Sequence, residues 1–171
     1  MTLITKTGAA DDRFTRFDTL EDALATDEPV LIPLAFAPAY VEQRPGAEFG
    51  ISVPGSAAIE DVAPHLETAA LVAVEFPSFA DGRGFSLARK IVREGFAGTL
   101  RASGPLIADQ FLDALACGFT EVELPETMAN RQPAQQWLSA KETMSDHYQS
   151  GYGTEPSILQ KRLAARKGAS V

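Results

Sequence analysis

Hydrophobic and polar positions follow two different patterns along the chain, one typical of strands and one typical of helices. Four runs predict strands, namely residues 49–53, 71–76, 99–102 and 121–124, and proline or a Ser-Gly-Pro turn follows each of them. The run at 71–76 begins with four consecutive apolar residues, which is typical of a strand buried on both faces. An earlier apolar run, 30–36, contains Pro33, which lacks a ladder N–H, so we expect an edge or irregular strand there.

The segments between these runs predict helices. Apolar residues recur three or four positions apart over 56–66 and 84–95, as on one face of an amphipathic helix. A third helix is predicted to begin at Ser103-Gly104-Pro105, where proline fits the first turn, and to end at Gly118. Residues 1–18 predict an edge strand or an ordered arm. Residues 133–147 predict a last helix that is anchored on the sheet by Trp137.

Strand and helix therefore repeat at intervals of roughly 20 to 30 residues, the length of βα units. Such units need right-handed crossovers and a mostly parallel sheet, so the predicted fold class is α/β. Two closures satisfy the pattern: an open doubly wound sheet, or a partial (half) β/α barrel. In both, the loops after the strands gather at one edge. We expect one domain over residues 1–148 and a tail, 149–171, that is disordered or docks on a partner.

Composition narrows the function classes. The formal net charge of −8 makes the average surface repel nucleic acid. No apolar stretch approaches the roughly 20 residues of a membrane span, so we expect a cytoplasmic protein that binds neither nucleic acid nor membrane. The single cysteine, Cys117, cannot form an internal disulfide. Neither His65 nor His147 has a second ligand at metal spacing, and no dinucleotide fingerprint follows a strand. No metal site and no cofactor are therefore evident.

The loop after the second of these strands carries the strongest candidate chemistry. Glu75 ends the strand, Asp81 and Arg83 follow it, and Gly84 and Ser86 begin the helix. Such a loop lies at the carboxyl end of a strand and the amino end of a helix, where ligands usually bind. The helix dipole and the guanidinium of Arg83 both favour an anion. Alternatively, Arg83 pairs with Asp81 or Glu75 and only holds the loop.

Neighbouring strand ends add further polar groups at the same edge. Arg101 and Ser103 lie at the end of the next strand, and Glu123 lies near the end of the last one. Together with the loop they predict a small-oxyanion site. Its predicted binding residues are Arg83, Gly84, Ser86, Arg101 and Ser103. Alternatively, Arg101 balances Glu75 or Glu123 across neighbouring strands.

The central segment also resembles a known family. Residues 76–89 read F-P-S-F-A-D-G-R-G-F-S-L-A-R. They are similar to the motif F-P-x-F-x-D-G-R-G-[YF]-S-x-A-R of a bacterial family of unknown function, often described as an oxidoreductase of sulfite reduction and encoded beside assimilatory sulfite reductase. The likeness covers roughly residues 30–150 and includes G-T-L-R-A-S-G at 98–104, D-Q at 109–110 and C-G-F at 117–119. The chain departs from the family at Ala108, where an arginine is common.

The resemblance implies an accessory protein of assimilatory sulfite reduction, within cysteine biosynthesis. It would bind the sulfite reductase hemoprotein or its electron donor, or a small sulfur oxyanion. No residue here carries electrons unaided, because redox work needs a bound cofactor or paired thiols. The alternative is a small enzyme acting on an anionic sulfur substrate, with Glu75 or Asp81 as general base and Arg83 and Arg101 as charge clamps. A third hypothesis is a scaffold whose acidic surface docks a basic partner.

Overall fold

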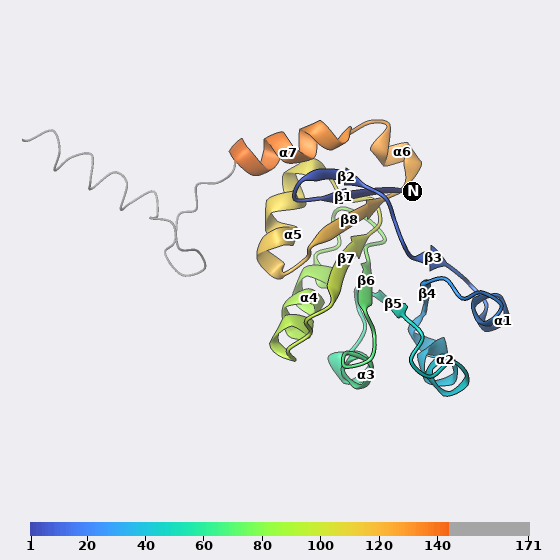
Figure 1. Cartoon of the computed structure of the whole chain (residues 1–171). Helices are drawn as coiled ribbons and strands as arrows, with labels where there is room; N and C mark the ends of the chain where they lie inside the picture. The colour runs from blue at the N-terminus through green and yellow to red at the C-terminus, as the bar shows by residue number, and fades with distance from the viewer. Residues whose placement is uncertain (144–171) are drawn as a thin grey trace, which may run out of the picture.

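The computed structural model describes residues 1–143 and shows an α/β fold built on one eight-stranded, mostly parallel sheet (Figure 1). The strands are β1 (Thr2–Thr5), β2 (Gly8–Ala10), β3 (Thr15–Arg16), β4 (Val30–Pro33), β5 (Phe49–Pro54), β6 (Leu71–Glu75), β7 (Thr99–Ser103) and β8 (Glu121–Leu124). The α-helices are α1 (Leu20–Leu24), α2 (Ala37–Gln43), α3 (Ile59–Val62), α4 (Arg83–Arg93), α5 (Phe111–Cys117), α6 (Glu126–Ala129) and α7 (Ala134–Thr143). Short 3-10 turns are η1 (Leu34–Phe36), η2 (Ala63–His65) and η3 (Ala108–Gln110).

Strand order decides between the two predicted closures. The order across the sheet is β2-β1-β8-β7-β6-β5-β4-β3, so strands β3 to β8 are parallel neighbours in chain order. The β1–β2 hairpin adds two antiparallel strands beside β8. Consecutive right-handed crossovers place their helices on one face of the sheet. A doubly wound sheet would instead reverse its strand order at a switch point. The sheet therefore curls into a half-barrel with helices outside it (Figure 1).

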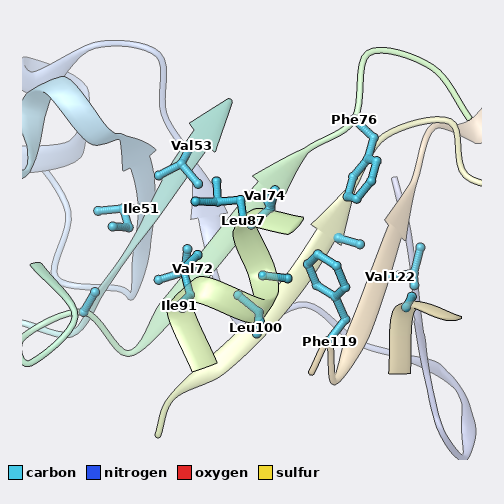
Figure 2. Close-up of a cluster of buried hydrophobic side chains, with 14 of the residues drawn as sticks. Ile51, Val53, Val72, Val74, Phe76, Leu87, Ile91, Leu100, Phe119 and Val122 are labelled. Atoms are coloured by element: carbon cyan, nitrogen blue, oxygen red, sulfur yellow. The ribbon is translucent and has the colours of Figure 1, made fainter. Parts of the chain in front are cut away.

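The main hydrophobic core lies between this sheet and the helices. Val53, Val72 and Val74 point from β5 and β6 toward α4, where Leu87 and Ile91 meet them (Figure 2). These side chains are all buried, with exposed fractions of 3% or less. Every second residue of each strand points to the helix-covered face of the sheet, because successive strand side chains point to opposite faces.

The concave face of the half-barrel is different, because it is largely polar. Phe14 packs there against Leu31, Leu71 and Ala73 in a small second cluster. Most of the remaining positions on β5 to β8 carry polar or charged side chains. Those that are buried are Ser52, Arg101, Ser103 and Glu123. The segment between β2 and β3 supplies Asp12 and Phe14 to this face, and β3 itself supplies Arg16.

Two local predictions need correction. The strand at 30–33 is not at the edge, because the two-residue β3 pairs outside it. Pro33 is the last residue of β4, where its missing N–H costs little. The helix after β7 does not begin at Ser103-Gly104-Pro105. Gly104 has a φ of 136° and the N–H of Leu106 bonds to its carbonyl at 2.9 Å, so the chain turns before η3 and α5 begin.

The ends of the chain agree with the sequence where they are described. The predicted edge strand or arm corresponds to β1, β2 and β3. Trp137 of α7 is fully buried and meets Phe111 edge to face, with ring centroids 5.5 Å apart. Trp137 therefore packs on Phe111 of α5, whereas the sequence predicted that it would anchor the last helix on the sheet. His147 and the predicted tail at 149–171 lie outside the described residues.

Candidate functional site

A cleft of about 510 Å³ opens at the carboxyl ends of β5, β6 and β7. Four of the predicted site residues line it together: Glu75, Asp81, Arg83 and Ser103. The register of the sheet explains this, because Glu75 lies beside Ser103 on β7 and beside Pro54 on β5. The three strands therefore end at the same level, in the position where α/β folds commonly bind ligands.

Asp81 and Arg83 form an ion pair at the start of α4. Arg83 Nε lies 3.0 Å from Asp81 Oδ1, and Nη2 lies 2.6 Å from Oδ2. The backbone N–H of Arg83 also donates to Oδ1 at 3.1 Å. These hydrogen bonds from Arg83 lower the pKa of Asp81 to about 2, which makes Asp81 a weak base at neutral pH. The pair holds the loop, yet 65% of the Arg83 side chain is exposed.

Two glycines let α4 begin close to the strand ends. A Cβ on Gly84 would lie 2.4 Å from the ring of Phe76, and a Cβ on Gly55 would lie 2.8 Å from the carbonyl oxygen of Glu75. Neither position accepts a side chain without displacement of its neighbour. Gly84 is thus a packing residue beneath the loop and does not itself line the cleft.

Glu75 presents the carboxylate of β6 to the cleft. Its Oε1 accepts a short hydrogen bond from the hydroxyl of Ser52 on β5. Arg16 Nη1 lies 3.8 Å from the same oxygen. Oε2 has no hydrogen-bond partner within residues 1–143, and 47% of the side chain is exposed. Glu75 is therefore oriented by Ser52 and accessible to a ligand.

Arg101 is buried away from the cleft. Its side chain is only 2% exposed, and its guanidinium contacts three carboxylates. It donates to both oxygens of Asp12 at 2.6 and 2.7 Å and to Glu121 at 2.7 Å. Burial by itself lowers the pKa of Arg101, but the hydrogen bonds to Asp12 and Glu121 outweigh that effect and raise it. These contacts favour the charge-balancing alternative for Arg101, with Asp12 and Glu121 as its closest partners.

Arg16 is a site residue that the sequence analysis missed. From β3 it donates to Ser52 and Ser103 at 3.2 Å each and to Glu123 at 2.8 Å, so it connects strands β5, β7 and β8 across the concave face. It also lines the cleft. Its position in a two-residue strand gave no sequence signal, because short alternating segments occur throughout residues 1–18.

Comparison with protein families adds the evolutionary context. Residues 50–158 match a family model described as a bacterial protein of unknown function (DUF934). The chain belongs to this family. The DUF934 segment includes β6 to β8 and all of β5 except Phe49, and with them Glu75, Asp81, Arg83 and Ser103, whereas Arg16 precedes it. The predicted membership in a bacterial family of unknown function is confirmed, and the link to sulfite reduction stays a prediction. No curated protein matches the chain.

Within the DUF934 segment, Ser86 lies apart from the cleft. It lines a separate surface pocket of about 270 Å³ with Arg89, Asp113 and Cys117. The reason is that α4 leads away from the strand ends, and each helical residue adds about 1.5 Å along its axis. Among the described residues, no three His, Cys, Asp or Glu side chains are grouped so as to hold a metal ion. No helix in that part of the chain is long and apolar enough to cross a membrane.

The loop before α4 exposes a large apolar side chain while its backbone is fixed. Phe79 is 54% exposed. Its carbonyl oxygen accepts a hydrogen bond from Gln110 Nε2 at 2.8 Å, and the N–H of Ala80 donates to the hydroxyl of Ser78 at 3.2 Å. Residues 78–83, which we call the motif loop, thus present Phe79 and Arg83 outward from an ordered backbone.

Proposed function

We propose that this protein is an accessory protein of assimilatory sulfite reduction, and that it binds the sulfite reductase hemoprotein or its electron donor through the motif loop. The choice of pathway rests on the resemblance of residues 76–89 to the family motif. The observation that carries the binding role is the exposure of Phe79 and Arg83, four positions apart on one ordered loop.

The chemistry of the motif loop suits a protein interface. Aromatic side chains and arginine are enriched at interfaces and dominate their binding energy. Asp81 restrains the guanidinium of Arg83, and Gln110 restrains the backbone beside Phe79. Because these groups are ordered before binding, association loses less conformational entropy. Phe79 is one of three large hydrophobic side chains exposed in the described part of the chain, the others being Met1 and Val92.

Co-elution of the full chain with the sulfite reductase hemoprotein on size exclusion tests this proposal. We expect a complex with the wild type and its loss in Phe79→Ala and in Arg83→Ala. Matched controls lie at the other end of α4: Val92→Ala removes an exposed apolar side chain, and Arg93→Ala removes an exposed arginine. Both controls should co-elute like the wild type. The same series with the electron donor decides between the two partners. The proposal would be rejected if the wild type formed a complex with neither the hemoprotein nor the electron donor.

A second candidate function is supported by the cleft itself. The cleft brings Glu75, Arg83 and Ser103 together, which is the set expected for an enzyme acting on a small sulfur oxyanion. The pKa of Asp81 near 2 favours Glu75 over Asp81 as the general base. In this case the purified protein alone would consume sulfite or a related oxyanion. Glu75→Gln would abolish turnover and Arg93→Ala would preserve it, whereas no consumption across a panel of sulfur oxyanions counts against the enzyme.

A further inference from the structure

The cleft continues into a second hollow along the same edge of the sheet. That hollow, of about 520 Å³, lies over the carboxyl ends of β4 and β5 and shares Arg16, Asp18, Pro54 and Glu75 with the cleft. The two together form one groove, which we call the strand-end groove. It runs from η1 to the motif loop, because Leu34 lines one end and Arg83 lines the other.

The charges along the strand-end groove do not cancel. Arg83 is paired with Asp81, and Arg16 is bound most closely to the buried Glu123. The carboxylates of Asp18 and Asp61 have no ion-pair or hydrogen-bond partner within residues 1–143, and both residues are exposed. Glu75 leaves its Oε2 open, as described above. After internal pairing, the groove therefore presents three accessible carboxylates and a single partly open guanidinium.

The walls of the groove are apolar between these carboxylates. Phe17, Pro33 and Leu34 line the second hollow, and Phe76 and Pro77 line the cleft. Apolar walls beside carboxylates suit the side chains of lysine and arginine, which bury an aliphatic stem and keep the charged head in a polar environment. A small inorganic anion would find few free donors here, since both terminal nitrogens of Arg16 and two of the three nitrogens of Arg83 already have protein partners.

We propose that the strand-end groove receives a basic segment of a partner protein, whose lysine or arginine side chains meet Asp18, Asp61 and Glu75. The argument is charge complementarity, because a cationic segment supplies what the groove leaves unpaired. This inference deepens the proposed function, on which the identity of the partner rests. The groove adjoins the motif loop at Asp81 and Arg83, so a partner held by Phe79 has the groove within its reach.

The direct test uses a probe that does not depend on the partner. A peptide with fluorescein on its N-terminal nitrogen, fluorescein-Ala-Arg-Ala-Arg-Ala-amide, is titrated with the full chain by fluorescence anisotropy, beside the same peptide with citrulline in place of arginine. Combining Asp18→Asn, Asp61→Asn and Glu75→Gln should weaken binding of the arginine peptide by at least about tenfold. The matched control combines Glu67→Gln, Glu94→Gln and Asp113→Asn, which alters net charge equally at exposed positions outside the groove. We expect this control to change binding by less than about twofold.

The outcomes separate the two proposals. Equal weakening in both combined variants would show an effect of net charge alone, and equal binding of the citrulline peptide would show an apolar groove; either result overturns the inference. If the groove variant keeps the wild-type affinity for the arginine peptide while Phe79→Ala still loses the reductase complex, the groove inference fails and the proposed function stands. If the groove binds the arginine peptide selectively but no reductase complex forms, the proposed function fails and the groove inference stands.

Discussion

Replacing Arg101 by methionine tests whether this arginine holds the N-terminal segment against the sheet. Methionine keeps an apolar stem of similar length but loses the hydrogen bonds to Asp12 and Glu121. Removing one partner of a buried ion pair costs about 3–5 kcal/mol, because the other charges stay buried without compensation. Asp12 is 30% exposed and can be rehydrated, so we expect the lower end of that range, about 3 kcal/mol.

Urea unfolding followed by Trp137 fluorescence measures this loss of unfolding free energy, and thermal unfolding measures it as a shift in Tm. For a chain of this size each kcal/mol shifts Tm by about 2–4 °C, so Tm should fall by about 6–12 °C. Arg93→Met is the matched control, because Arg93 is exposed and has no ion-pair partner within residues 1–143, and it should stay within about 0.5 kcal/mol of wild type. A similarly small change in Arg101→Met, combined with lost binding of sulfite, would refute the structural role and restore the predicted oxyanion role.

The same variant should respond to pH in a defined direction. Burial raises the pKa of Asp12, but hydrogen bonds from Arg101 and from the N–H of Phe14, and the charges of Arg101 and Arg16, outweigh this and lower it. A carboxylate with a lowered folded-state pKa stabilises the fold above its ordinary value of 3.8 and loses that contribution as pH falls through the folded value. The stability difference between wild type and Arg101→Met should therefore stay constant between about pH 5 and 7 and narrow below 3.8.

Three further predictions concern the start of α4. Gly84→Ala should destabilise the fold by about 1–3 kcal/mol in urea unfolding, because its Cβ would lie 2.4 Å from the Phe76 ring. Gly82→Ala is the control: nothing lies within 4 Å of its Cβ, so it should change the free energy of unfolding by less than about 0.5 kcal/mol. Equal effects of the two substitutions would contradict the packing argument. The carboxyl carbon of Asp81 should titrate in NMR with a midpoint of about 2, and a midpoint near its ordinary 3.8 would mean that the ion pair is not formed in solution. Gln110→Ala should speed amide exchange in the motif loop, whereas unchanged exchange would show that this hydrogen bond does not order it.

The βα units could be predicted because their signals are local. A run such as Leu71–Glu75 and the helix spacing after it lie next to each other in sequence, and the structure places them as β6 and α4. The curl of the sheet could not be predicted, because strand order depends on pairing between segments far apart. The position of the helix after β7 was missed because the positive φ of Gly104 ends the strand in a turn, and a proline in that turn resembles a helix start.

The same difference between local and long-range signals decides which parts of the candidate site could be predicted. Glu75, Asp81 and Arg83 belong to one strand–loop–helix unit, so their meeting at the cleft follows from sequence. Arg101 and Arg16 act through partners on other strands. Arg101 forms an ion pair with Asp12, and Arg16 forms one with Glu123, and the partners of each pair are far apart in sequence. Sequence alone therefore shows that charged residues occur at the strand ends but not which pairs neutralise each other.

The pairing of β1 with β8 has a consequence for synthesis of the chain. Thr2 lies opposite Leu124, so β1 leaves the ribosome long before its partner β8, which is the last strand of the described sheet in chain order. At ordinary translation rates that interval is on the order of ten seconds, during which β3 to β7 can associate one after another. The hairpin then joins the open border of β8 and covers backbone groups that would otherwise recruit another chain. Until the hairpin has paired, nascent chains on one messenger RNA expose the edge of β8 to each other. Pairing of β1 with β8 therefore protects the chain against co-translational aggregation.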